Sequence, residues 1–345
     1  MSALALPIAK ARPPRIGVEL IRRRAEAEFK RRMLAAIRDT SAKINLGRAM
    51  IAYRAGSVGG VMAEVPIDEV FTPALRTDRV FLDTYQAAGE RAARVLRSRL
   101  LRKDVDFSVK VEGFEFGVLN DRGLRQMQQH AATQVRFVSE ATKEGLRALL
   151  AGLLEGGATP REAMLAVKAR VGLLPLHQKA VANLRAELTE FGRLRAPTDA
   201  QRALFPNLID PKRPVTAARI DGIVARYTNM LHEHRASNIA RTEGAFAAGA
   251  GQLESWEQAA DEGLFKPEEA KQEWSTSLDA EVRDTHATME GQLVGMKEAF
   301  VTGDGERLRF PGDSSLGASA GNTASCRCVV NLVFDEDQDE TGGGR

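Results

Sequence analysis

The segment Cys-Arg-Cys-Val-Val-Asn-Leu-Val-Phe at residues 326–334 is the clearest strand signal in the chain. Branched and aromatic residues favour extended backbone, so this segment predicts a strand. Side chains two residues apart on a strand share a face, so we expect Cys326 and Cys328 to point the same way. Most patterns before it are helical. We therefore expect an α+β protein that is predominantly helical, with helical N-terminal and middle regions and a small C-terminal α+β module.

The composition is that of a globular protein of two or three domains. The 345 residues are 43% hydrophobic and 28% charged, with a net charge of +3 and two cysteines. This charge is too small to draw the whole protein to nucleic acid or a membrane, so such binding would need local patches. No apolar run approaches the roughly 20 residues of a membrane span, and no secretory signal opens the chain. We expect an intracellular protein whose cysteines are thiols or metal ligands.

Proline and glycine clusters suggest the domain boundaries. Residues 1–73 predict a basic amphipathic N-terminal arm, and 74–215 a helical domain with a short strand near 107–112. Residues 216–334 form the C-terminal domain, and 335–345 predict an acidic, disordered tail.

Apolar residues at helical spacing predict most of the elements. Thr159 and Glu162, with Pro160 between them, predict a capping box that opens a helix. The other expected helices lie within or at 16–54, 78–102, 121–154, 175–192, 216–251, 266–276 and 279–290.

His286, Cys326 and Cys328 could together ligate a metal ion. With a carboxylate such as Asp279 they would supply the four ligands of tetrahedral zinc. The alternative is that the cysteines are small buried residues, while the histidine joins a hydrogen-bonded network. Both interpretations stay open on the sequence alone.

Several polar residues of the C-terminal domain are interpreted as a structural network. We expect salt bridges between the helix that carries Arg241 and Glu243 and the helix predicted to begin at Asp279. The proposed members are Arg235, Arg241, Glu243, Trp274, Asp279, Arg283 and His286.

A second candidate surface is the basic face of the N-terminal arm. Arginines on an amphipathic helix could contact an oligomeric partner or duplex phosphate, although a solvated helix face is the commoner explanation for such charge. The candidates are Arg22, Arg23, Arg24, Arg31 and Arg32.

Sequence motifs of common enzyme classes are missing. His232, Glu233 and His234 do not form the His-Glu-x-x-His pattern of a zinc protease, and we expect them at the surface. The sequence also contains no Walker loop, dinucleotide-binding turn or nucleophile elbow.

The order of motifs in the last third resembles the phage Mu F-like minor head protein family, also called head morphogenesis proteins. The resemblance covers about residues 231–330. Ser325 stands where the family commonly has Asn, and Glu290 where it commonly has Asp. The matching positions are Arg235, Ile239 to Glu243, Lys271, Trp274, Asp279, Arg283, His286 and Cys326 to Cys328.

The resemblance implies a structural virion component and not an enzyme. It implies a minor capsid protein that acts in head morphogenesis, with the portal protein and the major capsid protein as partners. Double-stranded DNA is a further candidate partner, through packaging or delivery, with no membrane and no required cofactor. The protein would lie in the virion head, and in the host cytoplasm during assembly. Two alternatives remain: a zinc-dependent nuclease or transferase, and a DNA-binding packaging factor.

Overall fold

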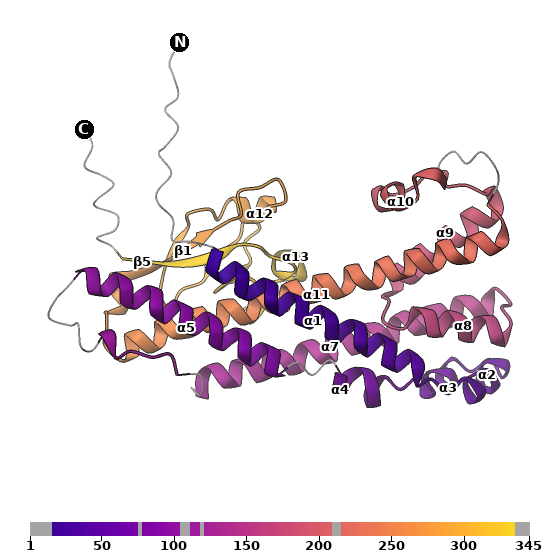
Figure 1. The fold of residues 1–345 in the computed structure, drawn as a ribbon, viewed down its shortest axis with the longest axis horizontal. Coiled ribbons are helices and arrows are strands. Elements are labelled where there is room, and N and C mark those ends of the chain that lie inside the picture. Colours follow the sequence, from indigo (N-terminus) through magenta and orange to yellow (C-terminus); the bar gives the residue numbers. More distant parts are fainter. Residues whose placement is uncertain (1–15, 75–77, 104–110, 118–120, 209–214, 335–345) are drawn as a thin grey trace, which may run out of the picture. The chain divides into compact units, whose positions relative to one another are not determined.

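The computed structural model describes residues 16–74, 78–103, 111–117, 121–208 and 215–334 (Figure 1). Its contacts divide the chain into two compact units. Unit 1 comprises Met1–Phe29, Asp78–Gln129 and Asn238–Arg345, and unit 2 comprises Lys30–Thr77 and His130–Ser237. Each unit is thus built from segments that are distant in the sequence. The consecutive boundaries expected at residues 73 and 215 remain predictions.

Helices make up most of the described chain, and a small sheet lies near its C-terminal end, which confirms the predicted fold class. No described helix combines the length and apolar character needed to cross a bilayer. The α-helices are α1 (Ile16–Ala42), α2 (Leu46–Arg54), α3 (Val58–Ala63), α4 (Thr72–Ala74), α5 (Asp78–Lys103), α7 (Asp121–Glu155), α8 (Pro160–Arg170), α9 (Pro175–Phe191), α10 (Asp199–Leu204), α11 (Ala217–Asp261), α12 (Asp284–Ala287) and α13 (Ala320–Thr323). A π-helical turn, η1 (Ile67–Phe71), and the 3₁₀ turns η2 (Pro206–Leu208) and η3 (Pro267–Glu269) complete them.

The long helices follow the predicted periodicity closely. Helices α1 and α2 cover the amphipathic segment expected within 16–54, and α5 and α7 begin at the expected residues. The capping box is also confirmed: the Thr159 side chain accepts from the Glu162 amide, and the Glu162 carboxylate accepts from the Thr159 amide. Local rules were sufficient here because caps and helix periodicity depend on neighbouring residues.

Unit 2 has a core made by α9, α10, α11 and the segments that connect them. Leu184 and Leu188 of α9 belong to one buried cluster with Ile220 and Tyr227 of α11. The helix α9 ends at Gly192, which adopts a left-handed conformation with φ of 62°. Glycine adopts this conformation without steric cost, so it is well suited to the end of the helix.

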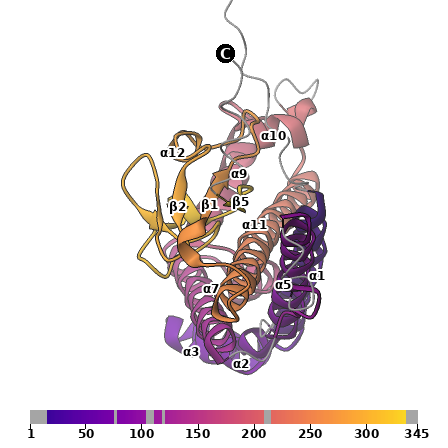
Figure 2. The same ribbon diagram turned by 90° about the vertical axis from the view of Figure 1, so that its left-hand side faces the viewer.

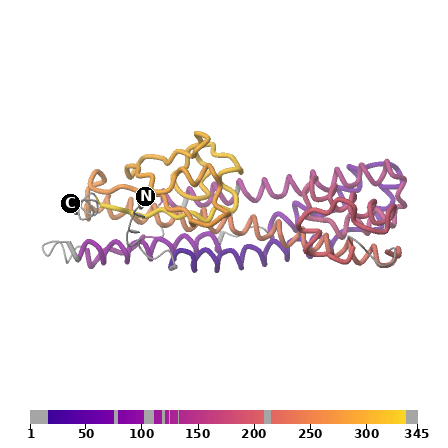
Figure 3. The backbone as a smooth tube through the Cα atoms, turned by 90° about the horizontal axis from the view of Figure 1, so that it is seen from above, coloured from indigo at the N-terminus to yellow at the C-terminus, as the bar shows by residue number. Residues whose placement is uncertain are grey.

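Unit 1 contains an antiparallel sheet of β1 (Ala270–Ser275), β2 (Leu293–Gly295) and β5 (Val329–Phe334) in the order β2-β1-β5 (Figure 2). Strand β1 is central and pairs Trp274 with Val330. A separate hairpin joins β3 (Phe300–Val301) to β4 (Arg307–Leu308). In the backbone trace the segments that follow α11 gather into one module (Figure 3).

Two of the predicted helices are wrong. Residues 266–276 contain β1, although Ala, Lys, Gln and Glu are good helix formers. Pairing with β2 and β5 on both sides outweighs that local preference, because strand formation depends on partners distant in the sequence. Within 279–290 only the short helix α12 forms. Asp279 accepts a hydrogen bond from the Glu281 amide, and such a bond favours a turn over a helix.

Other expectations fall partly or wholly outside the described residues. Of the strand expected near 107–112, residues 107–110 are outside, and Val111 and Glu112 are helical. The tail at 335–345 also lies outside the described residues. The C-terminal strand is confirmed from Val329, whereas Cys326 and Cys328 precede it.

Helix α11 does not end near Gly251 as expected but continues to Asp261. Gly251 instead permits a close approach to α5. A Cβ atom at Gly251 would lie 2.1 Å from the carbonyl oxygen of Tyr85 and 2.8 Å from its carbonyl carbon. Real Cβ contacts are never so short, so this glycine is required by packing within unit 1.

We predict that Gly251→Ala destabilises the protein by about 1–3 kcal/mol, because backbone of α5 would have to move. Gly152→Ala in α7 is the matched control. Gly152 is exposed, and a Cβ there meets nothing within 4 Å. Alanine should therefore stabilise that helix by about 0.5–1 kcal/mol. Denaturant unfolding measures both changes, and equal effects at the two positions would contradict the close approach.

Candidate functional site

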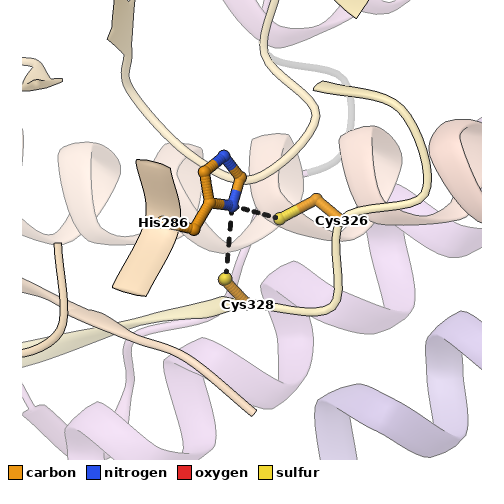
Figure 4. Close-up of side chains that lie close together, drawn as sticks. All are labelled: His286, Cys326 and Cys328. Atoms are coloured by element: carbon orange, nitrogen blue, oxygen red, sulfur yellow. Dashed lines mark hydrogen bonds between the residues drawn. The ribbon is translucent and has the colours of Figure 1, made fainter. Parts of the chain in front are cut away.

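A buried cluster of one histidine and two cysteines is the most distinctive chemical feature of unit 1. The Nδ1 atom of His286 lies 3.5 Å from Sγ of Cys326 and 3.6 Å from Sγ of Cys328 (Figure 4). All three atoms lie within 4.8 Å of one another. The side chains are almost inaccessible, with exposed fractions of 1% for His286, 1% for Cys326 and 4% for Cys328.

The histidine is positioned by α12 and by the neighbouring β1. Its ring packs edge-on against the Trp274 indole, with ring centroids 5.5 Å apart. The loop around α12 is tied to the segment before the cysteines by two contacts. Arg283 donates to the Ala324 carbonyl, and the Thr285 hydroxyl donates to the Asn322 side chain over 2.8 Å. These contacts hold the imidazole opposite the turn that carries both sulfur atoms.

Arg22 of α1 fixes the cysteine turn from the other side. Its guanidinium donates to the carbonyl of Cys328 over 2.9 Å and to the carbonyl of Cys326. Arg22 is 6% exposed. A planar guanidinium with several fixed donors can satisfy two carbonyls at once, which a lysine cannot do in the same geometry. Arg22 therefore orients the two peptide units whose side chains face His286.

The two sulfurs and the imidazole influence one another's acidity. A hydrogen bond from Cys328 and the contact with His286 place the pKa of Cys326 well below its usual value, although burial opposes this shift. The interaction with Cys326, together with burial, raises the pKa of Cys328. The indole N–H of Trp274 and the charge of Arg22 act on Cys328 in the opposite direction. A soft, electron-rich site of this kind can accept a proton or coordinate a metal ion.

The structure brings together only part of the predicted network. Trp274 and His286 are in ring contact, and Arg283 contacts the turn before Cys326. Asp279 lies near the surface and pairs with Arg327 over 2.6 Å, so it is not the fourth member of the cluster. The sequence did not suggest this pairing, because Asp279 was expected to lie on a helix.

Arg235 has a separate structural role in unit 2. It is buried and donates to the Thr142 hydroxyl over 3.1 Å, to the Val138 carbonyl over 3.2 Å and to the carbonyl of Gly172. Burial lowers the pKa of Arg235 to about 10. All of these partners belong to unit 2, where they join α7 to the turn after α8.

Thr242, in the middle of the triplet Arg241 to Glu243, holds the backbone just before the cysteines. This contact was not predicted from the sequence. The Thr242 hydroxyl accepts a 2.9 Å hydrogen bond from the amide of Ser325. Ser325 has a positive φ of 53°, a conformation that Asn adopts more readily than most residues. This explains physically why Asn suits the position, as in the family pattern. Glu243 is buried and Arg241 half-buried in α11.

Asn322 is a further residue that the sequence analysis missed. Its buried amide donates to the Asp304 carboxylate over 3.0 and 3.1 Å and to the Glu306 carboxylate over 2.7 Å. The turn between β3 and β4 is thereby attached to α13. The partners are 16 and 18 residues apart, so no local pattern predicts the contact. The polar composition of the turn is the only sign of it in the sequence.

The five arginines proposed for partner contact do not share one environment. Arg22 is buried against the turn that carries Cys326 and Cys328, so its assignment to an external surface is wrong. Arg23 and Arg24 are exposed, and Arg23 pairs with Glu19 one turn away. Arg31 is exposed and Arg32 half-buried. Helical spacing explains the difference, since consecutive residues on a helix face different directions.

His232 also differs from its expectation as a surface residue. It is 7% exposed in unit 2. Burial lowers the pKa of His232 to about 4, and the nearby Arg235 and His177 act in the same direction. A bond to the Val171 backbone and the charge of Glu233 oppose them. His232 is therefore held neutral in the folded protein.

Comparison with known proteins finds similarity in the C-terminal part of the chain. Residues 212–331 match the family model described as Phage Mu protein F like protein. The chain is also 33% identical over 101 residues to the minor head protein GP7 of Bacillus phage SPP1. That alignment covers 29% of this chain and 30% of the relative, so the chain spans less than a third of the relative's length. No solved structure matches. The two matches confirm the resemblance stated from the sequence.

We predict that Arg22→Met destabilises unit 1 by about 2–5 kcal/mol, because two buried carbonyls would each lose their donor. Arg23→Met is the matched control on the same helix. Its side chain is 70% exposed, so the expected change is within about 0.5 kcal/mol. Thermal and denaturant unfolding of both variants provide the measurement. Similar stability of the two variants would show that Arg22 does not hold the turn.

We also predict a pH dependence that originates at His232. An unfolded histidine titrates near pH 6.5, whereas folded His232 titrates near 4. The unfolded state therefore binds more protons between these values, so this contribution is present above pH 6.5 and is lost as the pH falls towards 4. Between pH 7.5 and 5.0 it should decrease the free energy of unfolding by about 2 kcal/mol. The variant His232→Gln should show a correspondingly shallower dependence in urea unfolding, and an unchanged dependence would exclude His232 as its source.

Proposed function

We propose, on the premise that residues 212–331 form a domain of the phage Mu F-like family, that the protein is a structural minor component of a phage or prophage head. The match over this domain is the observation that carries the proposal. The curated relative is itself described as a minor head protein. Its similarity lies in a region of 101 residues, so the role of the whole chain is inferred from this domain.

The geometry of the domain supports attachment in preference to turnover of a substrate. The residues with the strongest chemical character point inward: His286, Cys326 and Cys328 are nearly inaccessible. Arg22 and Arg283 use their guanidinium groups on backbone carbonyls of the same module. A nuclease or transferase needs such groups within reach of a substrate. The arrangement is better suited to bracing a folded module.

The portal protein and the major capsid protein are the partners we propose. Exposed Arg23 and Arg24 on α1 supply a basic surface for one of them. Arginine is well suited to carboxylates on a protein partner and to phosphates on double-stranded DNA. The salt dependence of binding distinguishes a protein partner from DNA, since DNA binding through phosphates weakens steeply as the salt concentration rises.

The experiment uses point variants, because residues 18, 22, 25 and 29 of α1 are buried and a deletion of the N-terminal region would remove core. Tagged protein is supplied to the parent phage or prophage lacking its own copy, and purified heads are tested by immunoblot. We expect the unaltered protein in heads at low copy number. The double variant Arg23→Ser, Arg24→Ser should be incorporated several-fold less, with unchanged thermal stability.

The matched control is Arg161→Ser, Arg193→Ser, which removes the same charge from two exposed positions elsewhere. It should be incorporated normally. Heads without the unaltered protein would overturn the proposed function. Equal incorporation of all three forms would leave the head role intact and exclude Arg23 and Arg24 as the contact. Strong, salt-sensitive binding of the purified protein to duplex DNA would favour a packaging role.

A further inference from the structure

The spacing of the three atoms in the buried cluster is that of ligands around one metal ion. In tetrahedral zinc sites the Zn–S bond is about 2.3 Å and the Zn–N bond about 2.0–2.1 Å, so a ligand nitrogen and sulfur lie about 3.6 Å apart. The observed distances from His286 Nδ1 to the two sulfurs are 3.5 and 3.6 Å. Both nitrogen–sulfur distances therefore agree with ligation of one central ion.

Hydrogen bonding alone explains this geometry less well. A ring nitrogen carries either one hydrogen or one lone pair, so Nδ1 can form one good hydrogen bond. Two sulfurs at nearly equal distances would have to share it. The other ring nitrogen, Nε2, is buried and has no hydrogen-bond partner among the described residues. The ring orientation therefore depends on what Nδ1 contacts.

The surroundings of the sulfurs suit metal-bound thiolates. Arg22 donates to the backbone carbonyls of Cys326 and Cys328, so it fixes both residues and brings a positive charge close to them. The indole of Trp274 packs edge-on against the His286 ring, with ring centroids 5.5 Å apart. Contacts that fix the position of the ligating residues are typical of the outer shell of metal sites.

Beside the cluster lies a small hollow where a further ligand could be placed. Cys328, Arg22 and Gln272 line it together with apolar side chains. The Oε1 atom of Gln272 is buried and has no hydrogen-bond partner in the described part of the chain. The amide nitrogen of Gln272 donates to the Met296 carbonyl over 3.0 Å, and its Oε1 could accept a hydrogen bond from a water molecule on the ion.

We propose that His286, Cys326 and Cys328 bind one zinc ion, with a water molecule as the fourth ligand. Soft thiolates and imidazole are the donors that zinc prefers in proteins. The ion would join α12 to the turn before β5, and Arg22 would couple this joint to α1. This inference concerns the construction of unit 1 and does not depend on the role in the head.

Metal content of the purified full-length protein tests the proposal. Protein produced with added zinc and kept reduced with a phosphine should contain about one zinc per chain. The zinc content per chain should be at least about tenfold lower in each of the variants His286→Gln, Cys326→Ser and Cys328→Ser. The matched control is His232→Gln, which replaces another buried histidine and should retain the zinc.

A second measurement covers the case in which the variants do not fold. Removal of metal from the unaltered protein by a chelator should lower Tm by roughly 5–10 °C, and added zinc should restore it. Cobalt in its place should show thiolate charge-transfer absorption. The proposal fails if folded, zinc-supplemented protein contains no stoichiometric metal, or if zinc persists in the cluster variants.

Discussion

A buried guanidinium requires acceptors for its N–H groups, and in unit 1 Arg22 finds them on the carbonyls of Cys326 and Cys328. This interaction constrains both partners. The helix α1 must lie where its arginine can reach the turn, and the turn must present two carbonyls in the plane of the guanidinium. The orientation of the two sulfurs, and so their distance from His286, follows from that requirement. The strand β5 then continues from a fixed starting point.

This construction places polar groups inside a module whose core is otherwise largely apolar. Trp274 provides aromatic packing there, against the His286 ring on one side and against Phe300. The hydrogen bonds from Arg22 and Arg283 to backbone carbonyls leave the loops around the cluster few alternative arrangements. The chemistry of the cluster is thus consistent with rigidity as its purpose.

The helices of this protein could be predicted from the sequence and much of the module could not. Helix periodicity and the Thr159 cap depend on residues a few positions apart. The cap and the starts of α5 and α7 were predicted correctly, whereas the helices predicted at 266–276 and 279–290 were wrong. Strand β1 was missed because its preference comes from β2 and β5, which are distant in sequence. His286, Cys326 and Cys328 were identified as a group from their chemistry and order. Arg22 was misassigned, since no local pattern reveals a partner 306 residues away.

The division of unit 1 among Met1–Phe29, Asp78–Gln129 and Asn238–Arg345 has a consequence for biosynthesis. A ribosome releases the first of these segments long before the last, so the apolar side chains Val18 and Ala25 wait for their neighbours on α11 while the intervening chain is made. Contacts of such large separation form late and slowly. Unit 2 can close first, since its segments end at Ser237. A chain interrupted during translation would leave those apolar groups exposed and without the segment that covers them.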